Sequence, residues 1–375
     1  MLVTGFFAVE LFAGLQRLGG SYPVLEDCSA TIVIPAHDEG ALICDTVTQI
    51  ITGASGRFPI LVVADNCTDK TAALALSAGA RVVVRQDPNR RGKGFALCAA
   101  REQLRHNPPQ IIIVLDADCR MDGESLQGLS AAARSTGRAC QAVNLLAPDR
   151  NAPPMVQISS FAFMVKNLIR QRGLQRLAGR AHLTGTGMAL PWRLFETANL
   201  GGDNIVEDLA LGLELATQRV PPVLVEAATV WSAAASEAGT LVQRRRWEGG
   251  YLATSVRTVP RTIARSVARG DLRGIAAALD LSVPPLALLV LLNFAAGILG
   301  GAAVFAGGDA WPLLVQLVVG ILALTVLTIA WALEGRSYLS GTTLLRLPLY
   351  VLWKVPLYLG LARRGAPVEW LRTGR

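Results

Sequence analysis

The sequence predicts an α/β domain with a mostly parallel sheet, followed by helices that contact a membrane. Residues 29–235 alternate short apolar, β-rich runs with alanine-rich helical patterns. Near-continuous apolar runs are typical of strands that are buried on both faces of a sheet. The runs are Thr31–Ile34, Ile60–Ala64, Val82–Val84 and Ile111–Leu115.

Composition supports the membrane part of this prediction. Of the 375 residues, 51% are hydrophobic and only 17% are charged, whereas about 25% charged residues is usual in soluble proteins. The six cysteines are scattered without a C-x-x-C pair, which indicates small buried side chains in a reducing compartment rather than a disulfide framework or a zinc site.

Two apolar, uncharged windows are long enough to cross a membrane. Leu281–Ala306 and Trp311–Leu333 each exceed the length needed to span about 30 Å of hydrocarbon. Trp311 and Trp331 stand near the ends of the second window, as interfacial aromatic residues do. The alternative is a pair of buried core helices.

Two further segments are apolar but interrupted by polar residues. Met1–Leu15 contains Glu10 and lacks the basic start of a signal peptide, so residues 1–20 are expected to form an uncleaved anchor or an interfacial helix. Charged residues and prolines interrupt Leu344–Leu361, which favours a broken interfacial helix within residues 342–375, followed by a basic C-terminal tail.

Five arginines form a stripe before the first apolar window. They recur every four residues, with apolar residues between them at helical spacing, and are Arg257, Arg261, Arg265, Arg269 and Arg273. This arginine stripe predicts an amphipathic helix on anionic headgroups; a solvated helix face is the alternative. Because the arginines adjoin a membrane segment, the net charge of +8 indicates a membrane surface and no nucleic-acid partner.

Acidic residues follow the predicted strands directly. They lie in His37–Glu39, at Asp65 and in Asp116–Asp118. Ligands of open α/β sheets bind outside the carboxyl ends of the strands, so one cleft is expected there. The pair Asp116 and Asp118 suits a hard divalent cation, Mg²⁺ or Mn²⁺, which also contacts substrate phosphates.

Four more segments have side chains suited to a phosphorylated sugar substrate. Lys93 stands between two glycines in "RRGKGFAL", outside any Walker pattern, and "HLTGTGMALP" could line a substrate. Glu207 and Asp208 begin a predicted helix, where they could also be simple dipole partners. The segment "QRRRWEGG", Gln243–Gly250, joins a basic cluster to a tryptophan and could neutralise a diphosphate and stack on a sugar; a surface helix is the alternative.

In this order and spacing, the motifs resemble those of membrane-attached family 2 glycosyltransferases with a GT-A fold. The resemblance covers roughly residues 30–250 and the flanking membrane segments, and it is strongest to the ceramide glucosyltransferase-like and cellulose-synthase-like branches, which share a Q-x-x-R-W motif. It is carried by "TIVIPAHDEG", "ADNCTD", "RGKG", "LDADC", "TGTGM", "VEDLALGLEL" and "QRRRW".

The resemblance implies a role for each matched residue. Asp65 would contact the base of a nucleotide-sugar donor, Asp116 and Asp118 would hold the metal ion, and Asp208 would be the catalytic base. Further donor-binding residues would be Pro35, Ala36, Glu39, Lys93 and Arg246. Acceptor-binding residues would be Thr186, Gly187, Glu207, Gln243 and Trp247. His37 and Asp38 depart from the family pattern, in which an aromatic or small residue and Asn commonly precede the Glu.

These roles predict inverting, metal-dependent transfer of a single hexose, expected from a UDP-sugar, to a membrane-bound lipid or lipid-linked acceptor. A GT-A domain is expected at residues 28–238, and the QRRRW segment with the basic interfacial helix at 239–275. Positive charge beside the membrane segments places the domain in the cytoplasm at a bacterial inner membrane. A processive polysaccharide synthase that exports its polymer is the alternative; an inactive scaffold subunit is disfavoured because the acidic motifs are intact. The sugar, the acceptor and the oligomeric state stay open.

Overall fold

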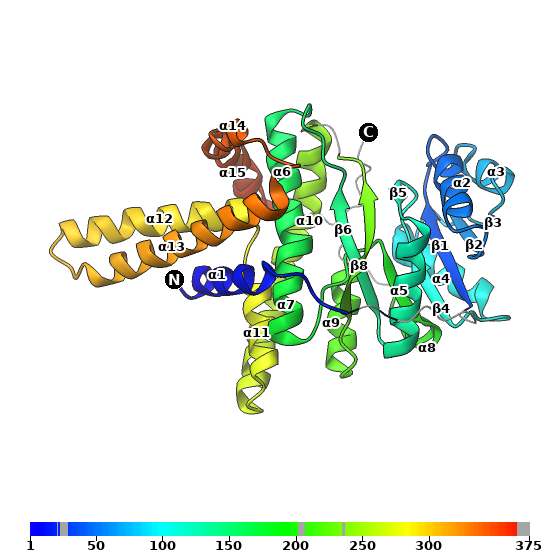
Figure 1. Ribbon diagram of the computed structural model, residues 1–375, viewed down its shortest axis with the longest axis horizontal. Coiled ribbons are helices and arrows are strands. Elements are labelled where there is room, and N and C mark those ends of the chain that lie inside the picture. The colour runs from blue at the N-terminus through cyan, green and yellow to red at the C-terminus, as the bar shows by residue number, and fades with distance from the viewer. Residues whose placement is uncertain (21, 23–28, 202–206, 235–236, 366–375) are drawn as a thin grey trace. The chain divides into compact units, whose positions relative to one another are not determined.

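The computed structural model describes residues 1–20, 22, 29–201, 207–234 and 237–365. Residues 366–375 of the expected C-terminal segment 342–375, and the start of the segment Asn204–Leu215, lie outside the described residues. The chain divides into two compact units (Figure 1). The sheet unit comprises Leu18–Ala147 and Arg180–Ala233; the helical unit comprises Met1–Arg17, Pro148–Gly179 and Ala234–Arg375.

The sheet unit contains an eight-stranded mixed sheet in the order β3-β2-β1-β4-β7-β6-β8-β5. Parallel pairing joins β1 to β2 and β4, β2 to β3, and β6 to β8, whereas β7 is antiparallel to both of its neighbours. The predicted mostly parallel sheet is confirmed. The strands are β1 Ala30–Ala36, β2 Ile60–Asp65, β3 Arg81–Arg85, β4 Ile111–Val114, β5 Cys119–Arg120, β6 Cys140–Leu146, β7 Met188–Pro191 and β8 Val223–Ser232.

Helices cover both faces of this sheet, and this explains the continuous apolar strands. Successive side chains of a strand point to opposite faces. Ile32 and Ile34 of β1 therefore enter one buried cluster, and Val33 between them enters another. The helices of the sheet unit are α2 Ile43–Gly53, α3 Thr71–Ser77, α4 Lys93–Leu104, α5 Gly123–Thr136, α8 Trp192–Thr197 and α9 Glu207–Thr217.

The helical unit consists of α-helices and two π-helical segments among its described residues. The long helix α10 contains both the QRRRW segment and the first three arginines of the stripe, and Gly270, with φ of +62°, follows its end. The elements are α1 Leu2–Gly14, α6 Pro154–Met164, η1 Val165–Arg170, α7 Gln171–Ala178, α10 Glu237–Ala268, α11 Leu272–Ser282, α12 Leu286–Phe305, α13 Trp311–Ala330, η2 Trp331–Gly335, α14 Gly341–Leu344 and α15 Leu347–Arg364. Residues 148–179, expected within the GT-A domain, belong to this unit.

Two helices in the described part of the chain are long and apolar enough to cross a membrane. They are Leu286–Phe305 and Trp311–Gly335, which lie side by side in Figure 1. Only 6% and 17% of their apolar windows are buried. A helix that is apolar all round and unburied is unlike a core helix of a soluble protein, so the core-helix alternative is not supported.

The two amide side chains of these helices contact each other, and one of them also contacts α1. Asn293 Oδ1 accepts a hydrogen bond from Thr4 Oγ1 at 3.0 Å and another from the Gln316 amide. Asn293 Nδ2 donates to the Leu289 carbonyl at 2.8 Å. Polar side chains in apolar helices commonly satisfy one another in this way, so these residues join α1, α12 and α13.

A buried ion-pair cluster also holds α1 in the helical unit. Arg170 donates from Nε to Glu10 Oε2 at 2.6 Å and from Nη2 to Asp280 Oδ1 at 2.7 Å. Arg176 donates to the carbonyls of Gln16 and Arg17 beyond the end of α1, at 2.7 and 2.8 Å. The charge of Glu10 within an apolar helix is thus paired with an arginine of η1.

Candidate active site

The parallel pairing of β1, β2 and β4 brings the predicted strand-end residues to one edge of the sheet. Ala36 is in register with Ala64, and Val33 with Val114. The carboxyl ends of all three strands therefore point the same way. Three predicted groups meet at this edge: the loop from Pro35 to Glu39, Asp65, and the pair Asp116 and Asp118.

The side chain of Asp65 is buried and held by two neighbours. Its Oδ1 accepts hydrogen bonds from Arg85 Nη1 at 2.5 Å and from Asn66 Nδ2 at 3.1 Å. His37 Nδ1 lies 2.8 Å from the carbonyl oxygen of Asp65, which joins the loop after β1 to the end of β2. The carboxylate is therefore fixed before any donor binds.

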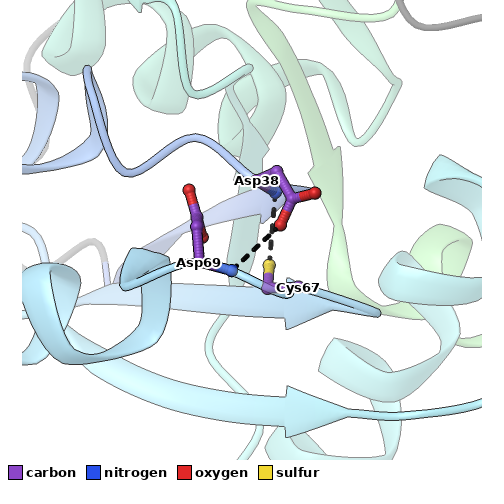
Figure 2. Close-up of side chains that lie close together, drawn as sticks. All are labelled: Asp38, Cys67 and Asp69. Carbon is purple, nitrogen blue, oxygen red and sulfur yellow. Dashed lines mark hydrogen bonds between the residues drawn. The ribbon is translucent and has the colours of Figure 1, made fainter.

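Figure 2 shows Asp38, Cys67 and Asp69 close together where the loops after β1 and β2 meet. The Asp38 carboxylate accepts from the backbone N–H groups of Thr68, at 2.7 Å, and Asp69, at 3.3 Å. The Thr68 N–H lowers the pKa of Asp38, whereas burial raises the pKa of the Cys67 thiol. The protonated thiol of Cys67 and the Asp38 carboxylate, which accepts from backbone N–H groups, therefore hold the two loops together and have a structural role.

Asp116, Asp118 and Cys119 have potential ligand atoms that lie within 4.8 Å of one another. Burial raises the pKa of the Cys119 thiol well above its ordinary range, so the thiol stays protonated and the donors are the two carboxylates. The Lys93 ammonium already pairs with Asp116, and so the site attracts positive charge. Oxygen donors in this arrangement fit a hard divalent cation such as Mn²⁺ or Mg²⁺.

The Lys93 side chain also lies near Asp208. Its Nζ donates to the Gly185 carbonyl at 2.7 Å. A side chain at Gly185, where φ is +85°, would lie 3.2 Å from Asp208 Oδ2 and 3.7 Å from Lys93 Nζ. Burial lowers the pKa of Lys93, but the negative charges of Asp116, Glu207 and Asp208 together outweigh burial and raise the pKa above its ordinary value. Lys93 is thus a charged group that is paired with Asp116 and close to Asp208.

The loop from Thr184 to Gly187 is shaped by Gln141 of β6. Gln141 accepts from the Thr184 N–H at 2.9 Å and donates to the Thr186 carbonyl at 2.9 Å. Thr186 Oγ1 in turn accepts from the Asp116 N–H at 3.1 Å. A side chain at Gly187 would lie 2.7 Å from Val230 Cγ1. The contacts of Thr186 and Gly187 are therefore structural, and their part in acceptor binding stays a prediction.

The QRRRW residues lie on α10 of the helical unit, where Arg244 holds Trp247 in place. Arg244 donates to Ser159 Oγ and to the Ser159 carbonyl, both at 3.0 Å. Its guanidinium lies 5.2 Å from the ring centroid of Phe163 and 5.4 Å from that of Trp247. Such stacking restricts the orientation of an aromatic ring.

A second set of contacts fixes the residue after Trp247. Glu248 accepts from Lys354 Nζ at 2.7 Å and from the Tyr358 hydroxyl at 2.9 Å, which joins α10 to α15. Gln243, Arg246 and Trp247 belong to a different unit from the donor-side residues. Their part in the active site stays a prediction.

Sequence reasoning does not identify Arg85, Gln141 or Arg244 as functional. Arg85 ends an apolar run, and its partner Asp65 is visible only once the register of β2 with β3 is known. Gln141 could have been noticed as an amide inside the apolar run Cys140–Leu146. In "QRRRW" the family pattern draws attention to Arg246 rather than to the buried Arg244.

Comparisons with known proteins identify the family and the fold. The sequence model of the family described as "Glycosyltransferase like family 2" matches residues 29–250. No curated protein matches the chain.

Among solved structures, a mannosyltransferase from Pyrobaculum calidifontis in complex with GDP-Man and Mn²⁺ is 17% identical, with a TM-score of 0.53, over 95% of this chain and all of the other. Glucosyl-3-phosphoglycerate synthase from Mycobacterium tuberculosis, in complex with Mn²⁺, UDP-glucose and phosphoglyceric acid, is 19% identical over 61% of this chain and 85% of its own, with a TM-score of 0.39. At these identities the first likeness shows a shared fold alone, and the expected GT-A fold is confirmed.

Proposed function

Because the chain belongs to the family 2-like glycosyltransferases, we propose that it transfers a single hexose from a nucleoside-diphosphate sugar to a lipid or lipid-linked acceptor, with inversion. The observation that carries this proposal is the meeting of Asp116, Asp118, Lys93 and Asp208 at one edge of the sheet. Two carboxylates for a cation, an ammonium for phosphate and a separate carboxylate for a proton are the groups that the reaction needs.

On the donor side, the residues serve to stabilise a leaving nucleoside diphosphate. Asp116 and Asp118 would hold Mn²⁺ or Mg²⁺, which when bound supplies charge neutralisation at the diphosphate. Lys93 would exchange its contact with Asp116 for one with a phosphate oxygen, and Arg246 would add a second cation. Charge on the leaving group increases in the transition state, so these cations stabilise it more than the ground state. Asp65, with Pro35, Ala36 and Glu39, would bind the nucleoside.

On the acceptor side, Asp208 would act as the general base. The acceptor oxygen forms a bond to the anomeric carbon from the face opposite the diphosphate. The bond from that carbon to the diphosphate breaks, and the acceptor proton passes to Asp208. One displacement inverts the anomeric centre without a covalent sugar–enzyme intermediate. Gln243 and Trp247, with Glu207 and the Thr186–Gly187 loop, would contact the acceptor.

The membrane part of the proposal places the acceptor at a lipid surface. Two helices are long and apolar enough to span a bilayer, and all five residues of the arginine stripe are exposed. Exposed arginines next to a membrane segment interact with anionic lipid. Positive charge beside the spans supports the proposal that the catalytic residues face the cytoplasm at an inner membrane.

The arginine stripe provides a direct test of lipid contact. Replacing Arg261, Arg265 and Arg269 together with Gln is expected to weaken association with vesicles containing anionic lipid, by about 1 kcal/mol per residue at most. Flotation with anionic and with zwitterionic vesicles would measure this. A control triple variant at Arg57, Arg81 and Arg105, exposed positions of the sheet unit, should keep wild-type binding. Equal losses in the two triple variants would mean that the stripe is an ordinary solvated surface.

Single addition is favoured over processive synthesis by the polar residues of the apolar helices. An exported polymer needs a water-filled path walled by protein. Asn293 instead accepts hydrogen bonds from both Gln316 and Thr4. Because these amide side chains are hydrogen-bonded to each other, the two helices have few polar groups left to bind a sugar chain.

Mass spectrometry of products made with excess donor tests this choice. We expect a single mass increment of one hexose per acceptor from protein of known stoichiometry. A ladder of lengthening chains would instead support the processive alternative. No product from any donor, with intact fold, would favour the inactive scaffold.

A further inference from the structure

Arg85 is held from four sides at the end of β3. Its Nη1 donates to Asp65 Oδ1 at 2.5 Å and to the Arg90 carbonyl at 2.7 Å, and its Nη2 donates to Asp87 Oδ2 at 3.1 Å. Its guanidinium carbon lies 5.5 Å from the ring centroid of Phe95 on α4. One side chain therefore connects the carboxylate at the end of β2 with the loop that leads to Lys93.

This contact makes the two oxygens of Asp65 unequal. Oδ1 accepts from both Arg85 and Asn66, whereas no donor within the described ranges bonds to Oδ2. A carboxylate paired with a guanidinium is purely an acceptor of hydrogen bonds. Oδ1 of Asp65 is thus already hydrogen-bonded within the protein, and Oδ2 is the oxygen that can accept from a ligand.

The four common bases differ in what they present to such a carboxylate. Uracil presents a single ring N–H between two carbonyl oxygens. Guanine presents a ring N–H beside an amino group, and this pair is matched by two carboxylate oxygens together. Cytosine and adenine present a ring nitrogen that accepts, which a carboxylate oxygen repels. One available oxygen is therefore complementary to uracil.

We propose that Arg85 determines base specificity: by occupying Oδ1 of Asp65, it leaves a single acceptor and selects a uridine nucleotide over a guanosine nucleotide. The inference rests on the proposed function, in which Asp65 binds the donor base, and it adds a specificity-determining residue to that site. Arg85 acts through Asp65 and is a positioning residue.

Only arginine can make this set of contacts. The planar guanidinium donates in several fixed directions, whereas a lysine ammonium is a compact point charge on a flexible stem. Arg85→Lys would keep the positive charge near Asp65 but could not also hold Asp87, the Arg90 carbonyl and the face of Phe95. Asp65 Oδ1 would then become available for a second donor from guanine.

Calorimetry on the full-length protein in lipid nanodiscs with Mn²⁺ tests the proposal, with UDP, GDP and CDP as the probes. The wild type is expected to bind UDP at least about tenfold more tightly than GDP, the value of one hydrogen bond to a charged group. Arg85→Lys should weaken UDP binding and narrow the UDP-to-GDP ratio. The matched control Arg81→Lys, at the exposed start of β3, should change neither value.

A second variant gives a result that misfolding cannot produce. Asp65→Asn keeps the shape but replaces one acceptor with an amide donor. With Oδ1 still held by Arg85, the free amide Nδ2 donates to the ring nitrogen of cytosine but opposes the ring N–H of uracil, so the order of UDP and CDP should reverse. That gain of CDP binding supports the assignment of Asp65 and Arg85.

Three outcomes would overturn the inference, and they separate it from the proposed function. If the wild type binds GDP at least as tightly as UDP, the specificity assignment is wrong while nucleotide-sugar transfer stands. If Arg85→Lys weakens UDP and GDP equally, Arg85 is structural only. If the wild type binds no nucleoside diphosphate at all, the proposed function falls, and the inference falls with it.

Discussion

Replacing Asp208 with Asn is expected to lower turnover at least about 10²-fold, the usual contribution of a general base, with nearly unchanged donor binding. The amide keeps the size of the side chain and can still accept from the Leu209 N–H, as Asp208 Oδ1 does at 2.8 Å. It cannot take up the acceptor proton. Release of the nucleoside diphosphate would report turnover, and calorimetry with the donor nucleotide would report binding.

A control on the same helix separates this effect from damage to α9. Glu214→Gln removes a carboxylate from α9 that accepts a hydrogen bond from Gln218, just after the end of the helix, and it should leave turnover unchanged. If Asp208→Asn lost donor binding instead of turnover, Asp208 would belong to the donor site. If it kept full turnover, another group would be the base.

Chelation is expected to abolish activity, and Mn²⁺ or Mg²⁺ should restore it. Asp118→Asn should lose activity in the presence of either ion while the protein unfolds at the wild-type temperature. Without a bound metal ion, the carboxylates of Asp116 and Asp118 would face the diphosphate with only the Lys93 ammonium paired to Asp116, and carboxylates repel phosphate. Rates in EDTA and after addition of each ion, together with thermal unfolding curves, would measure this.

The matched control is Asp45→Asn, an exposed acid in the first turn of α2. It removes the same charge from the sheet unit but lies outside the strand-end loops, so its metal dependence should equal that of the wild type. Full activity of the wild type in excess chelator would contradict the assignment of Asp116 and Asp118 as metal ligands.

The strands that carry the donor side could be predicted from the sequence because they are buried on both faces. Ile111–Leu115 is continuously apolar because Ile111 and Ile113 enter one core cluster and Ile112 and Val114 the other. The same apolar pattern shows where each strand ends, and therefore which acidic residues lie at the strand ends. Local sequence was sufficient here because each strand and its polar end are adjacent in the chain.

The second half of the sheet could not be predicted in the same way. The antiparallel strand β7 inserts between β4 and β6, and this position depends on contacts distant in sequence. The interior of β6 contains the polar side chains Gln141 and Asn144, which obscure its apolar pattern. Their role becomes clear only in the folded structure, where Gln141 and Asn144 donate hydrogen bonds to the Thr184–Gly187 loop.

The pairing of Arg85 with Asp65 shows the same limit within the site. The two residues are 20 positions apart and become neighbours through the register of β2 with β3. Sequence motifs place the chemistry at Asp65, but the neighbour that fixes its orientation lies at the end of another strand.

The most direct test of the central claim is a donor screen with the purified protein in native-like lipid and Mn²⁺, with nucleoside diphosphate and modified lipid measured in the same reaction. The account predicts that one nucleotide hexose, expected to be a UDP-sugar, releases one nucleoside diphosphate for each lipid that gains one hexose, and that both products disappear in chelator. Release of nucleoside diphosphate without any modified lipid, or no release from any nucleotide sugar, would contradict it.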